Sequence, residues 1–140
     1  MTAPDPARLA SVELFQDLSD EDREHLAAWM EVEEIPAGHV MLREHTSGYA
    51  FFILDEGRAH AEADGKVLEV LEPGAVFGEM AFFAPDGERT ATIVPETPLR
   101  VYTMFGTRFR QMQQELPEVA SRLRQIVETR ADRLRAADQA

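Results

Sequence analysis

The chain has 140 residues, a net charge of −12 and a pI of about 4.7, so it lacks the basic balance that direct nucleic-acid binding needs. It contains no cysteine, which excludes disulfides and cysteine-ligated metals. No apolar stretch approaches the ~20 residues of a membrane span, and the first ten residues lack the pattern of a signal peptide. We therefore expect a cytoplasmic protein that does not enter a membrane and forms a single domain over residues 1–140.

The N-terminal part, residues 1–30, is predicted to be a tail followed by one helix. Residues 1–8 are rich in proline and alanine and are typical of a loose tail. Ser19 is a good helix N-cap, and the three acidic residues 20–22 that follow it suit the first turn of a helix. The helix is expected to end near Met30.

Residues 31–105 have the pattern of short strands separated by turns that contain glycine, proline or aspartate. This spacing predicts a mainly β (α+β) fold: an eight-stranded antiparallel jelly-roll β-roll, flanked by the N-terminal helix and two C-terminal helices. The expected strands are Val32–Ile35, Val40–Arg43, Tyr49–Leu54, Ala59–Ala63, Val67–Leu71, Val76–Phe77, Thr90–Val94 and Leu99–Met104.

The C-terminal part, residues 106–138, is predicted to form two helices, at about 107–115 and 117–137. Its arginines alternate with acidic residues, which indicates a solvated helix rather than a DNA-binding arm. An apolar stripe recurs along the second helix, and it either packs on the β-roll of its own chain or forms a parallel homodimer seam. The stripe consists of Leu116, Val119, Ala120, Leu123, Ile126, Val127, Leu134 and Ala137, with Arg130 interrupting it.

The segment 77–94, with the sequence FGEMAFFAPDGERTATIV, contains the most informative group of residues. Gly78 allows the backbone to approach a ligand closely, and amides at a helix start attract an anion. Arg89 can bind a phosphate through two parallel hydrogen bonds, while Glu79 can accept hydrogen bonds from sugar hydroxyls. These residue types at this spacing indicate a site for a small sugar phosphate.

The same segment resembles the phosphate-binding cassette of the cyclic-nucleotide-binding domain family. That family includes catabolite-activator-type regulators, regulatory subunits of cAMP-dependent protein kinase and cyclic-nucleotide-gated channels. Residues 77–82 (Phe-Gly-Glu-Met-Ala-Phe) and 89–91 (Arg-Thr-Ala) match the family pattern. The resemblance implies that Glu79 holds the ribose 2′-hydroxyl and Arg89 the exocyclic phosphate oxygens. It also implies that the amides of Gly78, Ala81 and Thr90 complete the phosphate cradle.

The residues that would contact the base are less sharply indicated. Leu68 and Met80 are candidates for apolar contact with it, and ordinary core packing is the alternative for Leu68. Arg135 can either stack over the base or be a solvated surface arginine. The Thr90 hydroxyl can reach the amino group of a guanine, although the frequency of cAMP binders in the family favours cAMP over cGMP.

Catalysis and metal binding have little support in the sequence. The four histidines are scattered, and no HxH, HExxH or nucleophile-elbow pattern occurs, which argues against an enzyme and against a metal-dependent β-barrel. Two hypotheses remain. The chain is either a regulatory cyclic-nucleotide sensor whose C-terminal helices move on binding and act on an unknown effector protein, or a ligand-free β-roll used for protein interaction and dimerisation.

Overall fold

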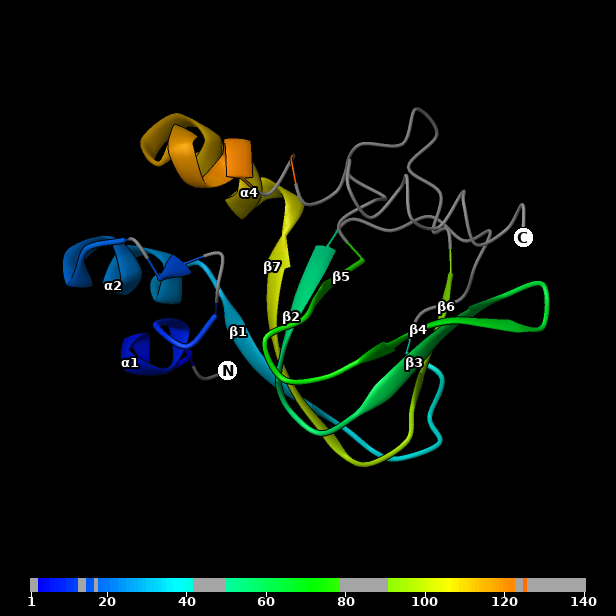
Figure 1. Cartoon of the computed structure of the whole chain (residues 1–140). Coiled ribbons are helices and arrows are strands. Elements are labelled where there is room, and N and C mark those ends of the chain that lie inside the picture. The colour runs from blue at the N-terminus through cyan, green and yellow to red at the C-terminus, as the bar shows by residue number, and fades with distance from the viewer. Residues whose placement is uncertain are drawn as a thin grey trace.

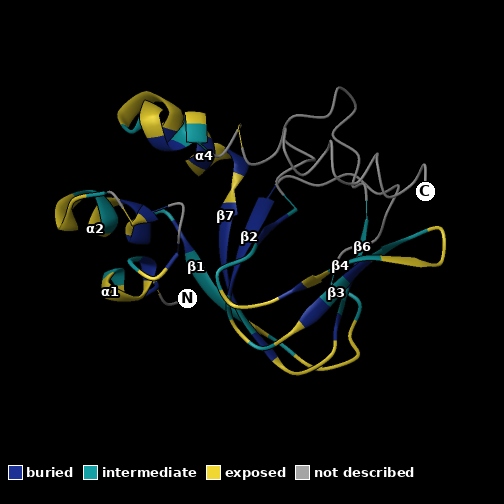
Figure 2. Ribbon diagram, viewed as in Figure 1, coloured by how far each residue is buried: buried dark blue, intermediate teal, exposed yellow. Residues whose placement is uncertain are grey.

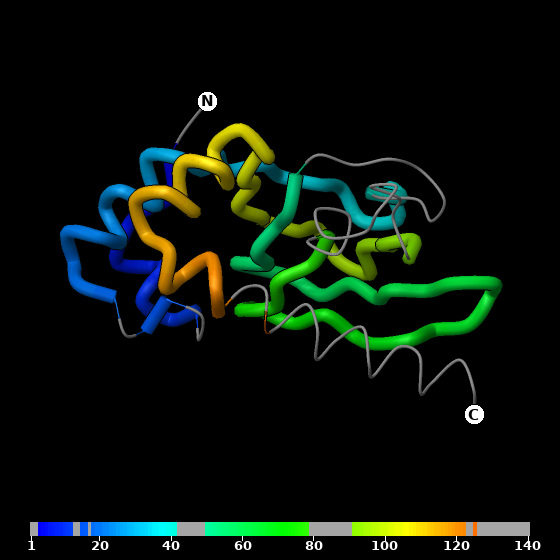
Figure 3. Tube along the Cα trace, turned by 90° about the horizontal axis from the view of Figure 1, so that it is seen from above, coloured from blue at the N-terminus to red at the C-terminus, as the bar shows by residue number. Residues whose placement is uncertain are grey.

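The computed structural model describes residues 3–12, 15–16, 18–41, 50–78, 91–122 and 125. The strands of these residues form two antiparallel sheets, a four-stranded one in the order β1-β7-β2-β5 and a three-stranded one in the order β4-β3-β6. The helices α1, α2 and α4 lie on one side of the molecule, and the β3–β4 hairpin extends away from them (Figures 1 and 3). The elements are α1 (Pro6–Leu9), α2 (Asp20–Ala28), β1 (Glu31–Ile35), β2 (Ala50–Glu56), β3 (Ala59–Ala63), β4 (Lys66–Leu71), β5 (Val76–Phe77), β6 (Thr92–Pro95), β7 (Leu99–Phe105) and α4 (Gly106–Glu115).

The predicted mainly β fold with flanking helices is confirmed, with seven strands among the described residues. The expected strand at 40–43 is described only at its first two residues, which are not assigned to a strand. The Met41 amide nevertheless donates a hydrogen bond to the Ile93 carbonyl at 2.9 Å, so the chain runs beside β6 there.

The prediction of a loose tail over residues 1–8 is wrong, because helix α1 begins at Pro6. The Asp5 side chain accepts a hydrogen bond from the Ala7 amide at 2.9 Å, and proline at the first helical position has its backbone angle already set for a helix. Leu9 at the end of the helix is fully buried, so tertiary packing stabilises a helix that is too short to persist alone.

Helix α2 begins where the sequence predicts. The Ser19 hydroxyl accepts a hydrogen bond from the Asp22 amide at 3.1 Å, and the acidic first turn matches the positive end of the helix dipole. The helix ends at Ala28, two residues before the expected end, and Met30 is buried just after it.

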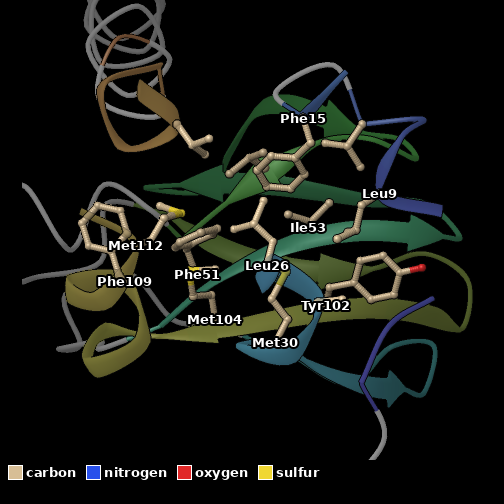
Figure 4. Close-up of a cluster of buried hydrophobic side chains, with 14 residues drawn as sticks. Leu9, Phe15, Leu26, Met30, Phe51, Ile53, Tyr102, Met104, Phe109 and Met112 are labelled. Atoms are coloured by element: carbon tan, nitrogen blue, oxygen red, sulfur yellow. The ribbon is translucent and has the colours of Figure 1, made fainter. Parts of the chain in front are cut away.

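The four-stranded sheet separates two buried cores. Strand β2 alternates between them, because successive side chains of a strand point to opposite faces. Its Phe51 and Ile53 join the helical-side core, which also contains residues of α1, α2 and α4, whereas its Phe52 and Leu54 face the second sheet in the roll-interior core. Strands β2 and β7 are buried along most of their length (Figure 2), and Figure 4 shows the helical-side core.

The C-terminal helices pack on the helical-side core. Phe109 and Met112 of α4 are buried there, and the Phe109 ring meets the Phe51 ring edge-on at 6.0 Å between centroids. Residues 117–122 are helical, Val119 is buried in the same core, and Leu116 and Ala120 pack against it. At these stripe positions the interpretation of packing within one chain is confirmed. The later stripe positions, from Leu123 to Ala137, lie outside the described residues.

Candidate functional site

The segment that the sequence analysis singled out is described at its two ends. Strand β5 ends at Phe77 in the four-stranded sheet, and β6 begins at Thr92 in the three-stranded sheet, so the two ends lie on different sheets of the roll. Phe77 is fully buried and its ring stacks on Phe52 at 5.4 Å between centroids. Gly78 has φ of +80°, a backbone conformation that residues with a Cβ rarely adopt.

Most of the predicted ligand-binding residues cannot be placed from this structure. Gly78 and Leu68 are described. The predicted residues that lie outside the described part of the chain are Glu79, Met80, Ala81, Arg89, Thr90 and Arg135. Their proposed contacts remain predictions.

Leu68 is the extra residue of a β-bulge in β4. Glu69 pairs with Ala61 and Val67 pairs with Glu62, so Leu68 has no partner position on β3. Bulges turn a side chain away from the regular alternation of a strand. Leu68 is half-buried and is not among the described members of either core.

A polar cluster that the sequence analysis missed lies between α1 and the four-stranded sheet. Arg8 Nε donates a hydrogen bond to Asp55 Oδ1 at 3.1 Å, and its Nη2 lies 3.0 Å from Asp55 Oδ2 as an ion-pair contact. Tyr102 is next to them and is almost fully buried, with its hydroxyl at the edge of the helical-side core (Figure 4). The signal that could have revealed α1 is the Asp5-Pro6 start, followed by apolar residues at Leu9, Val12 and Phe15.

Burial and mutual contact perturb the ionisable groups of this cluster. Burial, followed by the neighbouring Asp55 carboxylate, raises the pKa of Tyr102 to about 12. The hydrogen bond that Arg8 donates to Asp55 raises the pKa of Arg8 above its ordinary value. Both groups therefore keep their protons at neutral pH, so that Arg8 remains a cation and Tyr102 remains neutral.

The other described arginines of the roll form surface interactions. Arg58 Nε lies 3.6 Å from Glu96 Oε1, and both side chains are exposed. Arg100 Nη2 lies 3.4 Å from Glu34 Oε1, and both side chains are exposed. Ion pairs of this kind contribute little to stability and do not define a ligand site.

His60 lies between two carboxylates on the outside of the three-stranded sheet. Its Nε2 is 3.1 Å from Glu62 Oε2, and its Nδ1 is 3.5 Å from Glu96 Oε2. The two carboxylates contact different nitrogens of the His60 ring, so they do not point at one common metal position. Among the described residues there is no group of three or more His, Cys, Asp or Glu that could hold a metal ion.

Comparison with known proteins identifies the family. The family model for the cyclic nucleotide-binding domain matches residues 32–115, more than half of the chain, and the chain therefore belongs to the cyclic nucleotide-binding domain family. The cAMP-dependent protein kinase regulatory subunit of Eremothecium gossypii is 34% identical over 126 residues, which are 89% of this chain and 27% of that protein. The cGMP-dependent protein kinase egl-4 of Caenorhabditis elegans is 30% identical over 96 residues, 64% of this chain and 12% of that protein.

Solved structures agree with this assignment. A structure described as "cAMP bound PfPKA-R (141-441)" is 26% identical with a TM-score of 0.84, and the match covers 95% of this chain and 46% of that one. The chain spans about a third or less of the length of the curated relatives it matches. Within the described part of the chain, no helix is both long and apolar enough to cross a membrane.

Proposed function

We propose that the chain is a cyclic-nucleotide sensor, regulatory rather than catalytic, which binds cAMP in preference to cGMP. The observation that carries this proposal is the family match over residues 32–115, which contains the whole 77–94 segment together with strands of both sheets. The positive φ of Gly78 supports it, because the backbone there has the conformation that a close approach to a ligand requires.

The binding roles follow from the chemistry of the segment. Arg89 binds the phosphate oxygens, because a guanidinium offers two parallel donors to an oxyanion. Glu79 accepts a hydrogen bond from the ribose 2′-hydroxyl, and the amides of Gly78, Ala81 and Thr90 complete the phosphate site. Met80 and Leu68 contact the base, and Arg135 stacks on it. The half-buried position of Leu68 on a β-bulge, outside both cores, supports its part in this assignment.

The output of the sensor is a movement of the C-terminal helices. A ligand shifts a conformational equilibrium only if it contacts the two states differently, and the segment after Gly78 is where that contact would be made. Val119 is buried in the helical-side core, across the four-stranded sheet from the roll interior. A homodimer contact would therefore use the stripe from Leu123 onward. The effector is a partner protein that the sequence does not identify.

Isothermal titration calorimetry with cAMP and cGMP on the wild type and on Arg89→Ala tests the proposal. We expect binding by the wild type, tighter for cAMP, and a loss of about a hundredfold in affinity in the variant, because two charge-assisted hydrogen bonds disappear. Arg58→Ala is the matched control, since Arg58 is an exposed arginine outside the 77–94 segment. The nucleotide affinity of this variant should equal that of the wild type. No heat from the wild type with either nucleotide would favour the ligand-free interaction module.

A further inference from the structure

Arg8 of helix α1 forms ion pairs with two carboxylates of β2. Its Nε donates a hydrogen bond to Asp55 Oδ1 at 3.1 Å, and its Nη2 donates one to Glu56 Oε1 at 3.1 Å while lying 3.0 Å from Asp55 Oδ2. The two partners differ in environment, because the Asp55 side chain is 7% exposed and the Glu56 side chain 55% exposed. A carboxylate as buried as Asp55 is costly without a cation, so the Arg8 contact that matters is the one to Asp55.

Asp55 lies on the helical face of β2 by the regular alternation of the strand, which places Phe51 and Ile53 on the same face and Phe52 and Leu54 in the roll interior. A β-bulge occurs at this position, because Leu54 pairs with Val101 and Glu56 pairs with Arg100, so Asp55 is the extra residue on β2. The Asp55 carboxylate is next to Tyr102 on this face.

Open space lies beside this ion pair. A hollow of about 620 Å³ is bordered by the start of α1 on one side and by β1 and β7 on the other, and Arg8 and Tyr102 both line it. Glu34 lines the same hollow, so a second carboxylate is within the space into which Arg8 could swing. On the side of α1 that borders this hollow, the helix is therefore held by the ionic contacts of Arg8 rather than by close packing.

We propose that Arg8 and Asp55 form an ionic clasp that keeps α1 closed on the four-stranded sheet, and that the clasp opens in a local step separate from global unfolding. In the open state residues 3–12 leave the sheet. Tyr102 and the part of the core that Leu9 covers in the closed state then become exposed to solvent. Leu9 and Val12 belong to the same core as Val119. Opening of the clasp therefore also removes packing contacts from the core against which the C-terminal helix lies. This inference does not depend on the bound ligand.

Amide hydrogen exchange measures the opening directly. Four amides report closure, because each is hydrogen-bonded only when the α1 segment is folded: those of Arg8, Ala10, Ser11 and Val12. In Arg8→Gln we expect exchange at positions 10–12 to rise about tenfold or more, while exchange in β2 and β7 stays at the wild-type rate. The double variant Arg8→Gln/Asp55→Asn should recover part of the protection, since it leaves no unpaired buried charge.

Limited trypsin digestion gives a second readout, in a variant that retains Arg8. In Asp55→Asn the bond after Arg8 should be cut about tenfold faster than in the wild type, because the arginine is released and the helix opens more often. Glu96→Gln is the matched control, since it releases the exposed Arg58 and leaves α1 untouched. The proposal would be overturned if exchange in Arg8→Gln and cleavage in Asp55→Asn both stayed at the wild-type rate. It would also be overturned if amide exchange in Arg8→Gln rose equally in α1, β2 and β7.

Discussion

The two faces of the four-stranded sheet are equally well buried but connect different parts of the chain. The helical-side core joins residues from α1 and α2 to Val119 near the C-terminal end of the described chain. Among the described residues, the buried members of the roll-interior core all come from strands, and they include Phe77, next to Gly78. A single layer of strands thus separates the face where the ligand is proposed to bind from the face where the helices are held. The difference indicates that β2 and β7, which supply side chains to both faces, carry any coupling between them.

Neighbouring phenylalanines on β2 allow the strongest test of this division. Phe51→Ala and Phe52→Ala should each destabilise the protein by about 3–5 kcal/mol, because each removes a buried ring and leaves a cavity. Urea unfolding followed by circular dichroism measures the loss. Only Phe52→Ala should also weaken cyclic-nucleotide binding in the folded protein, since Phe52 stacks on Phe77 beside the proposed site.

The leucine variants Phe51→Leu and Phe52→Leu keep more of the core volume and allow the same comparison if the alanine variants unfold. A larger loss of nucleotide affinity in the Phe51 variant than in the Phe52 variant would contradict the division between the two faces.

Substitution of Val119 tests whether the start of the terminal helix packs on the core of its own chain. Val119→Ala should cost about 2 kcal/mol, the loss of two buried methyl groups, and leave the oligomeric state unchanged. Urea unfolding and size-exclusion chromatography with light scattering measure the two quantities. Glu118→Ala, at an exposed neighbouring position, should be nearly neutral. A Val119→Ala variant that keeps its stability and changes its oligomeric state would instead place this residue in an interface between chains.

The smallest effect is expected at the cap of α2. Ser19→Ala should lower the free energy of unfolding by about 1 kcal/mol, because the Asp22 amide loses its acceptor. Ser19→Asn preserves an acceptor and should recover most of that loss in the same unfolding measurement. Nucleotide affinity should be unchanged in both variants, and a change there would show that the helical layer is coupled to the ligand site more tightly than this account allows.

The parts of the fold that depend on local sequence patterns could be predicted, and those that depend on distant contacts could not. Strand β3 was predicted with its observed bounds because its alternation and its flanking turns are local signals. The Asp5-Pro6 start of α1 was also local, but a four-residue helix is stabilised by the burial of Leu9 and by Asp55, 47 residues away from Arg8. The alternation of β2 places Asp55 on the same face as Phe51 and Ile53, but nothing in the local sequence indicates its pairing with Arg8.

The candidate site divides in the same way. Gly78 was identified from the sequence as a residue that lets the backbone approach a ligand, but its positive φ was not predicted. The β-bulge at Leu68 could not be predicted, because it arises from the pairing of β4 with β3 rather than from the residues of β4 themselves.

A structure of the protein with cAMP tests the central claim most directly. We predict that the phosphate oxygens lie about 2.7–2.9 Å from the guanidinium of Arg89 and that the ribose 2′-hydroxyl donates to the carboxylate of Glu79. A nucleotide bound elsewhere, or Arg89 and Glu79 paired with each other with no space between them, would contradict the account.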